Sequence, residues 1–241
     1  MTRMPTNPTA SNGLERTRFT ARGVWRGCVE ILPIAAFVIP FGIAFGVAAS
    51  VKGIQPAVSI FMSVAIFAGA SQFAVLDLWT APLPLATLAL TVLAVNARHI
   101  LLGAALAPWL LRIPLAKRAA ALIFLSDGNF AYAWAARDRG EVDAGVLFGS
   151  GVTMWAMWIA STAVGALAGS LLGDLTRFGF DAVMVAYFTA VIAGQWKSRA
   201  DLVPWIAAAA VAVAGTYVLP PGWHIIAGAL AGGAVGVWRH G

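Results

Sequence analysis

The sequence has few charged residues and a single cysteine, and both shortages limit what the protein can be. Only 11% of the 241 residues are charged, whereas about 25% is typical of soluble domains. One cysteine, Cys28, leaves no partner for an intramolecular disulfide and too few thiolates for a sulfur-ligated metal site. A water-soluble fold and a disulfide-stabilised secreted fold are therefore excluded.

The sequence also lacks the short motifs of common enzyme classes. It contains no His-Glu-x-x-His zinc motif, no Gly-x-Ser-x-Gly elbow and no phosphate-binding glycine loop. Its three histidines, His99, His224 and His240, are too dispersed to indicate a metal site. We predict no enzyme activity, no cofactor and no metal, with an intramembrane enzyme as the alternative.

Long apolar runs are abundant instead. Hydrophobic residues make up 60% of the chain, and the mean hydropathy is +0.83. Uncharged runs of 21, 24 and 20 residues separate Glu30, Lys52, Asp77 and Arg98. Each run can cross about 30 Å of hydrocarbon as a helix. None alternates polar and apolar residues, as the strands of a membrane barrel would.

Apolar runs and helix breakers predict an all-α, multi-pass membrane protein with seven or eight transmembrane helices, some of them possible sites of a break. Leu219-Pro220-Pro221-Gly222 divides the last uncharged stretch in two. Because the loops are short, we expect residues 31–241 to form a single transmembrane domain. The predicted segments lie near 31–51, 56–79, 83–108, 119–136, 144–172, 182–196, 202–219 and 222–238.

Residues 1–30 are predicted to be a basic, partly disordered cytoplasmic tail. They contain five arginines and precede an apolar run that is too long for a cleavable signal. The net charge of +6 comes from this tail and from loops, as orientation signals do, so we expect no nucleic-acid partner.

The orientation of the loops is left open by the sequence. With eight full crossings, Arg112, Lys117 and Arg118 face outward, against the positive-inside tendency. If the 56–79 segment instead entered the bilayer and returned, these three would lie inside. The same change would move a second set outward, namely Arg137, Arg139, Lys197, Arg199 and Arg239.

Two polar clusters interrupt the apolar runs, at residues 96–99 and 126–129. An isolated arginine at mid-depth, as expected for Arg98, costs about 2.5–3.5 kcal/mol on insertion scales. Arg98 therefore needs a carboxylate partner, a wet cavity, or a route along its helix to the headgroups. Asp127 needs a counterion or a proton, and pairing with Arg98 or His99 is the simplest hypothesis.

Two segments are predicted to contain breaks. Ser126-Asp127-Gly128-Asn129 resembles a turn, and the centre of the 56–79 segment, Gly69-Ala70-Ser71-Gln72-Phe73, is similar. Discontinuous helices hold substrates or ions near the midplane of transporters. Ser71 and Gln72 have an alternative role in ordinary interhelical hydrogen bonding.

A small zwitterion bound between Arg98 and Asp127 would complement both of their charges. Arg98 would bind its carboxylate and Asp127 its ammonium, and protonation of Asp127 or His99 would link transport to the proton gradient. The candidate substrate-binding or proton-coupling residues are Asp127, Arg98, His99, Asn96, Asn129, Ser71 and Gln72.

Small residues recur at four-residue spacing in three stripes, which allow helices to approach closely. Each stripe serves either packing within the chain or docking of a second subunit. The stripes are Gly42, Gly46 and Ser50; Gly165, Gly169 and Gly173; and Gly228, Gly232 and Gly236.

Three motifs resemble the AzlC family, the large subunits of bacterial branched-chain amino acid exporters. They are Ala68-Gly69-Ala70-Ser71-Gln72-Phe73, Arg98-His99 followed by Gly103, and Leu125-Ser126-Asp127 followed by Phe130-Ala131. In order and spacing they match the family from the first spanning segment onward.

The resemblance implies a multi-pass protein of the bacterial inner membrane that exports valine, leucine and isoleucine, with methionine as a further candidate. It also implies a small AzlD-type membrane subunit as a partner. Relatives often carry a glutamate after the motif's aspartate, where this chain has Gly128. A channel or a structural subunit is the remaining alternative to a carrier.

Overall fold

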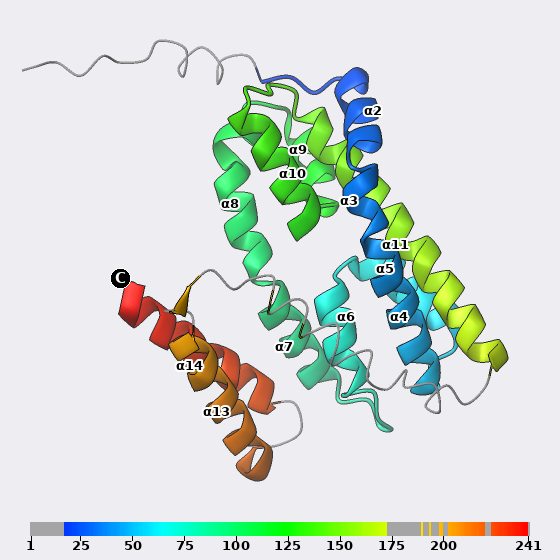
Figure 1. Cartoon of the computed structure of the whole chain (residues 1–241), viewed down its shortest axis with the longest axis vertical. Helices are drawn as coiled ribbons and strands as arrows, with labels where there is room; N and C mark the ends of the chain where they lie inside the picture. The colour runs from blue at the N-terminus through cyan, green and yellow to red at the C-terminus, as the bar shows by residue number, and fades with distance from the viewer. Residues whose placement is uncertain are drawn as a thin grey trace, which may run out of the picture. The chain divides into compact units, whose positions relative to one another are not determined.

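The computed structural model describes residues 17–172, 202–219 and 223–240, together with single positions at 189, 193, 198 and 199. The elements in these ranges are α-helices, which confirms the predicted all-α class (Figure 1). In chain order they are α2 (Ala21–Glu30), α3 (Leu32–Ala36), α4 (Val38–Val51), α5 (Pro56–Ile66), α6 (Gly69–Leu76), α7 (Leu85–Asn96), α8 (Arg98–Leu110), α9 (Leu115–Ile123), α10 (Asp127–Asp138), α11 (Gly145–Leu172), α13 (Leu202–Val218) and α14 (Trp223–His240).

Three helical stretches in the described part of the chain are long and apolar enough to cross a membrane. They are Leu32–Val51, Leu85–Leu110 and Gly145–Leu171. The first two contain local irregularities at Phe37 and Ala97. Pro40 accounts for the irregularity at Phe37, because it has no N–H to bond the carbonyl of Ala36. The predicted segment at 182–196 lies outside the described residues.

The two segments in which breaks were predicted are both interrupted. In the 56–79 segment, α5 ends at Ile66, because the left-handed backbone of Phe67 (φ 41°) stops the helix, and α6 begins at Gly69. This break precedes the predicted Gly69–Phe73 pentapeptide, because Gly69 and its successors form the first turn of α6. In the 119–136 segment, α9 ends at Ile123 and α10 begins at Asp127.

The chain forms two compact units. Among the described residues, unit 1 contains 17–42 and Arg98–Ser161. These ranges comprise α2, α3, the first part of α4, α8, α9, α10 and the first part of α11. Unit 2 contains Ile43–Ala97 and the described residues from Thr162 onward. These comprise the last part of α4, α5, α6, α7, the last part of α11, α13 and α14.

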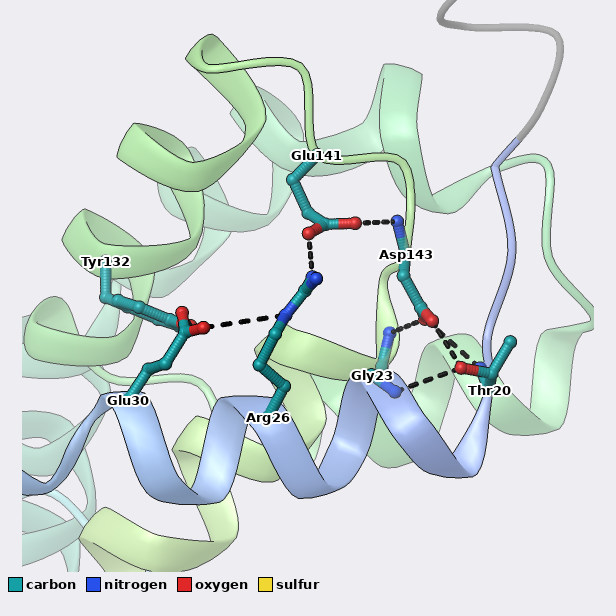
Figure 2. A network of polar contacts seen from close by, with 8 residues as sticks. Thr20, Gly23, Arg26, Glu30, Tyr132, Glu141 and Asp143 are labelled. Carbon is teal, nitrogen blue, oxygen red and sulfur yellow. Dashed lines mark hydrogen bonds and ion pairs between the residues drawn. The ribbon is translucent and has the colours of Figure 1, made fainter.

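A polar network in unit 1 joins α2 to the loop between α10 and α11 (Figure 2). Arg26 pairs with Glu141, and the Thr20 hydroxyl and backbone N–H both donate to Asp143. The Thr20 hydroxyl also accepts from the N–H of Gly23 and so caps α2. These contacts place the start of α2 beside the start of α11.

Buried polar and exposed apolar side chains have the distribution expected in lipid. Large apolar side chains point outward, including Leu93 (67% exposed), Ile100 (74%) and Leu171 (85%). Several serines and threonines are buried and bonded between or within helices, for example Ser63 to Thr162 at 2.9 Å between their hydroxyl oxygens. This arrangement fits a bilayer, where polar groups need internal partners.

Each of the three predicted small-residue stripes has glycines in close packing within the chain. An added Cβ at Gly46 would overlap the Thr162 carbonyl, and one at Gly165 would overlap the Ile43 carbonyl. In the third stripe, a Cβ at Gly228 would lie 2.8 Å from the Ala208 carbonyl oxygen. Packing within the chain therefore explains why these three positions are glycines. Gly173 of the second stripe lies outside the described residues.

We expect Gly165→Ala to destabilise the protein by about 1–3 kcal/mol, because the added methyl overpacks a backbone contact. Gly233→Ala is the matched control, since a Cβ there meets nothing within 4 Å. It should raise stability by up to about 1 kcal/mol through helix propensity. Thermal unfolding of the purified variants in detergent measures both. Equal midpoints for the two variants would contradict this packing.

Candidate functional site

Arg98 and Asp127 form an ion pair in unit 1. The Arg98 Nη2 and Asp127 Oδ2 atoms lie 3.0 Å apart, and the two side chains are 35% and 58% exposed. Arg98 opens α8 and Asp127 opens α10, so each charge lies at the start of a helix. Among the described residues, the structure gives the buried Arg98 Nε no hydrogen-bond partner. The pair therefore leaves hydrogen-bonding capacity on the guanidinium unused.

The local sequence explains how Asp127 reaches this position. Ser126 is the N-cap of α10, where its hydroxyl accepts from the N–H of Asn129. The Asn129 side chain accepts in return from the N–H of Ser126 at 2.6 Å. This capping box starts the helix at Asp127, whose carboxylate is favoured by the positive end of the helix dipole.

Asn129 is completely buried and holds the break between α9 and α10. Its Nδ2 donates to the carbonyl of Phe124 at 3.0 Å and to the carbonyl of Leu147 in α11 at 3.2 Å. The structure thus gives Asn129 a supporting role beside Asp127. The spacing Ser126-x-x-Asn129 is the sequence signal that could have indicated this role.

Gly128 allows close packing next to the ion pair. A Cβ at this position would lie 2.6 Å from the Met154 Cε and 3.1 Å from its sulfur. A glutamate here, as many relatives are expected to have, would require Met154 to move. In this chain the methionine side chain occupies the space beside Asp127.

Three of the other predicted site residues, Asn96, Ser71 and Gln72, lie in unit 2. Asn96 donates from Nδ2 to the Ser71 hydroxyl at 3.2 Å, and the Ser71 hydroxyl donates to the carbonyl of Ala68 at 2.9 Å. Gln72 is completely buried and donates from Nε2 to the Ser63 hydroxyl at 3.0 Å. Their predicted roles in binding remain predictions.

His99 follows Arg98 in the first turn of α8 and is half-buried. The carboxylate that was predicted to pair with either Arg98 or His99 is bonded to Arg98. An apolar hollow of about 460 Å³ lies elsewhere in unit 1, between Phe19, α2 and Lys117, and contains none of the predicted site residues.

Comparison with known proteins gives the family. The model of the AzlC protein family matches residues 33–172, which include the Arg98–Asp127 pair and both interrupted segments. No solved structure matches the chain.

Relatives are found in bacteria and archaea. The chain is 36% identical to the inner membrane protein YgaZ of Escherichia coli over 60% of each protein. It therefore spans about three fifths of that relative's length. It is 31% identical to an uncharacterized membrane protein of Archaeoglobus fulgidus over 88% of this chain and 94% of that protein.

A third relative has a name that includes an activity. The branched-chain amino acid transport protein AzlC of Bacillus subtilis is 32% identical over 70% of this chain and 66% of its own length. The family match, the names of the relatives and the apolar helices all indicate a membrane protein of this family. The chain belongs to the AzlC family of membrane transport proteins.

Proposed function

We propose that this protein exports branched-chain amino acids across the bacterial inner membrane, as the large subunit of a two-component carrier. The family match and the name of the Bacillus subtilis relative support this substrate class. The observation that carries the mechanism is the Arg98–Asp127 pair, because its two charges are complementary to those of a free amino acid.

The depth of the pair supports a role in transport. Residues 17–20, 111–118 and 138–144 lie together at one end of unit 1, where Lys117 bonds the Phe19 carbonyl and Arg18 bonds Val142. From Leu110, α8 runs back to Arg98 over about 18 Å at 1.5 Å per residue. From Asp138, α10 runs back to Asp127 over about 16 Å. Half of a 30 Å hydrocarbon core is about 15 Å, so the pair lies near the midplane.

Exchange of partners explains why two charges are tolerated at this depth. The planar guanidinium of Arg98 can bind a substrate carboxylate with two hydrogen bonds, and Asp127 can accept the substrate ammonium. Without substrate, the two side chains neutralise each other. Neither state of the carrier then leaves a charge uncompensated in the bilayer.

The selectivity for branched side chains is proposed to come from the apolar surroundings, in which Met154 packs next to Gly128. A thioether side chain adapts to different aliphatic shapes, which agrees with a substrate range that extends to methionine. Proton coupling through Asp127 or His99 is part of the same proposal.

Counterflow in proteoliposomes tests the proposed activity. The chain is purified with its small AzlD-type partner, and vesicles preloaded with unlabelled leucine are mixed with labelled leucine. We expect transient accumulation of label, which a carrier produces and a channel does not. Label recovered as unchanged leucine would argue against the enzyme alternative, and no accumulation with the partner present would contradict the proposal.

A further inference from the structure

The helices α5 and α6 have the same arrangement as α9 and α10, namely two short helices separated by a break. In both pairs a short helix ends at the isoleucine of an Ile-Phe dipeptide, Ile66-Phe67 or Ile123-Phe124. A second helix starts two or three residues after the phenylalanine. Each pair also follows a stretch long enough to cross the membrane, Leu32–Val51 or Leu85–Leu110. The same order of elements therefore occurs twice.

The sequences align when they are shifted by 57 residues. In the break regions Ile66, Phe67, Phe73 and Ala74 coincide with the identical residues Ile123, Phe124, Phe130 and Ala131. The buried amides Gln72 and Asn129 occupy equivalent positions. In the preceding helices Gly46 coincides with Gly103. The same shift of 57 residues aligns both the identical residues and the two breaks in the helices. This agreement indicates an internal repeat.

The equivalent amides have comparable roles. Gln72 bonds Ser63 in α5, and Ser63 bonds Thr162 in α11. Asn129 bonds the Phe124 carbonyl at the end of α9 and the Leu147 carbonyl in α11. Each amide thus joins the two arms of its own helical pair and connects that pair, directly or through one hydroxyl, to α11.

Each helical pair also ends near the level at which it begins. Lys52, before α5, pairs with Asp77, after α6, at 3.2 Å. For α9 and α10, Lys117 and Val142 both bond the segment that contains Arg18 and Phe19. A helix that crossed the bilayer once would separate its ends by about 30 Å. These pairs therefore have the geometry of hairpins that enter the bilayer and return.

We infer that residues 32–76 and 89–133 are two copies of one structural unit, each a crossing helix followed by a hairpin that re-enters on its own side of the membrane. Gln72 is the positioning residue of the first hairpin, as Asn129 is of the second. The role assigned to Gln72 in transport rests on the proposed function, whereas the topology does not.

This topology settles the orientation that the sequence left open. Because α5–α6 and α9–α10 both return, the loops on either side of α9–α10 lie on the side of the basic tail. The positive-inside tendency is then obeyed by Arg112, Lys117, Arg118, Arg137 and Arg139. The sequence-based alternative allowed one returning segment, and two are needed.

The two copies differ at the ion pair. The shift of 57 residues places Phe41 at the position of Arg98 and Ala70 at the position of Asp127. The first copy therefore contains neither charge. We assign charge recognition to the second copy alone, through Arg98 of its crossing helix and Asp127 of its hairpin. Gln72 keeps the first hairpin in place as the counterpart of Asn129.

Single-cysteine labelling tests the topology without any transport measurement. In a Cys28→Ala background, one cysteine is placed at an exposed position on each side of each hairpin. Since Leu32–Val51 crosses once and the tail is inside, Gln55→Cys and Thr80→Cys should react with an impermeant maleimide in intact cells. Ala116→Cys and Asp138→Cys should react only after permeabilisation. Opposite accessibility within either pair of variants would overturn the inference.

The positioning role is tested with Gln72→Leu, which removes the amide at similar volume. We expect leucine turnover to fall about tenfold while the half-saturating concentration stays within about twofold, because the substrate contacts remain. Ser63→Ala, which removes the acceptor, should have the same effect. Gln55→Leu, at a glutamine without a side-chain capping bond, is the control and should be unchanged. Normal turnover in Gln72→Leu, or a tenfold rise in half-saturating concentration, would refute the assignment.

Discussion

Replacement of Arg98 by alanine is expected to reduce leucine counterflow at least tenfold. The variant loses a charge-assisted hydrogen bond worth about 1.5–3 kcal/mol, which corresponds to roughly 10- to 150-fold in affinity. It also leaves the Asp127 carboxylate, which we propose to lie near the midplane, without its partner at 3.0 Å. Asp127→Asn should have an effect of similar size, because it leaves the arginine charge uncompensated.

Two further variants make this experiment specific. Arg98→Lys keeps the charge but loses the planar fork, so an intermediate rate is expected. Arg112→Ala removes an exposed arginine from the loop between α8 and α9 and should leave counterflow unchanged. A normal rate in Arg98→Ala, at equal amounts of protein in the vesicles, would remove the ion pair from the mechanism.

Replacement of Asn129 by alanine is expected to cause the largest loss of stability at the site. It would leave the Phe124 carbonyl without its Asn129 donor and the Ser126 N–H without its Asn129 acceptor. The Leu147 carbonyl would lose the same donor but keep the Ser150 hydroxyl. Each lost partner costs about 1–3 kcal/mol, so the total is roughly 2–6 kcal/mol. Unfolding of the purified protein in mixed micelles, followed by circular dichroism, measures this difference.

Ser126→Ala is the comparison that separates helix capping by Ser126 from the hydrogen bonds that Asn129 donates to Phe124 and Leu147. It removes the capping hydroxyl but keeps the Asn129 donors to Phe124 and Leu147. The expected loss is about 0.5–2 kcal/mol, as for other helix caps. If the serine variant were the less stable of the two, capping rather than the bonds to Phe124 and Leu147 would hold the break.

Much of the architecture could be predicted from hydropathy because the bilayer imposes a strict length on apolar segments. The segments predicted near 31–51, 144–172 and 202–219 agree with helical stretches in the structure. The interruptions at 56–79 and 119–136 were also predictable, since glycine, serine and aspartate weaken a helix in an apolar run. The exact break at Phe67 was not, because a left-handed phenylalanine has no local sequence signal.

The partners of polar residues were harder to predict than their presence. Hydropathy alone indicated that Arg98 and Asp127 needed compensation, and the structure pairs them. Gln72 and Asn129 were grouped with them because all are polar. The structure shows that both amides are completely buried and bonded within their own hairpins. Such assignments depend on tertiary contacts, and spacing along the chain does not specify these.

The contacts between loops also could not be predicted from the sequence. Whether a polar break lies in a crossing helix or in a returning hairpin depends on which loops meet. Lys52 with Asp77, and Lys117 with Phe19, provide that information. Counting charges in the loops could not provide this information, because the count depends on knowing beforehand which apolar runs cross the membrane.

Competition by leucine analogues tests the central claim that Arg98 recognises the substrate carboxylate. Labelled leucine is bound to the reconstituted complex, and unlabelled leucine is compared with isoamylamine, which lacks the carboxylate. Wild-type protein should prefer leucine by at least about tenfold, the equivalent of 1.4 kcal/mol, and Arg98→Ala should lose that preference. If the arginine variant still preferred leucine by the wild-type factor, the carboxylate would be bound elsewhere and the proposed exchange of partners would be wrong.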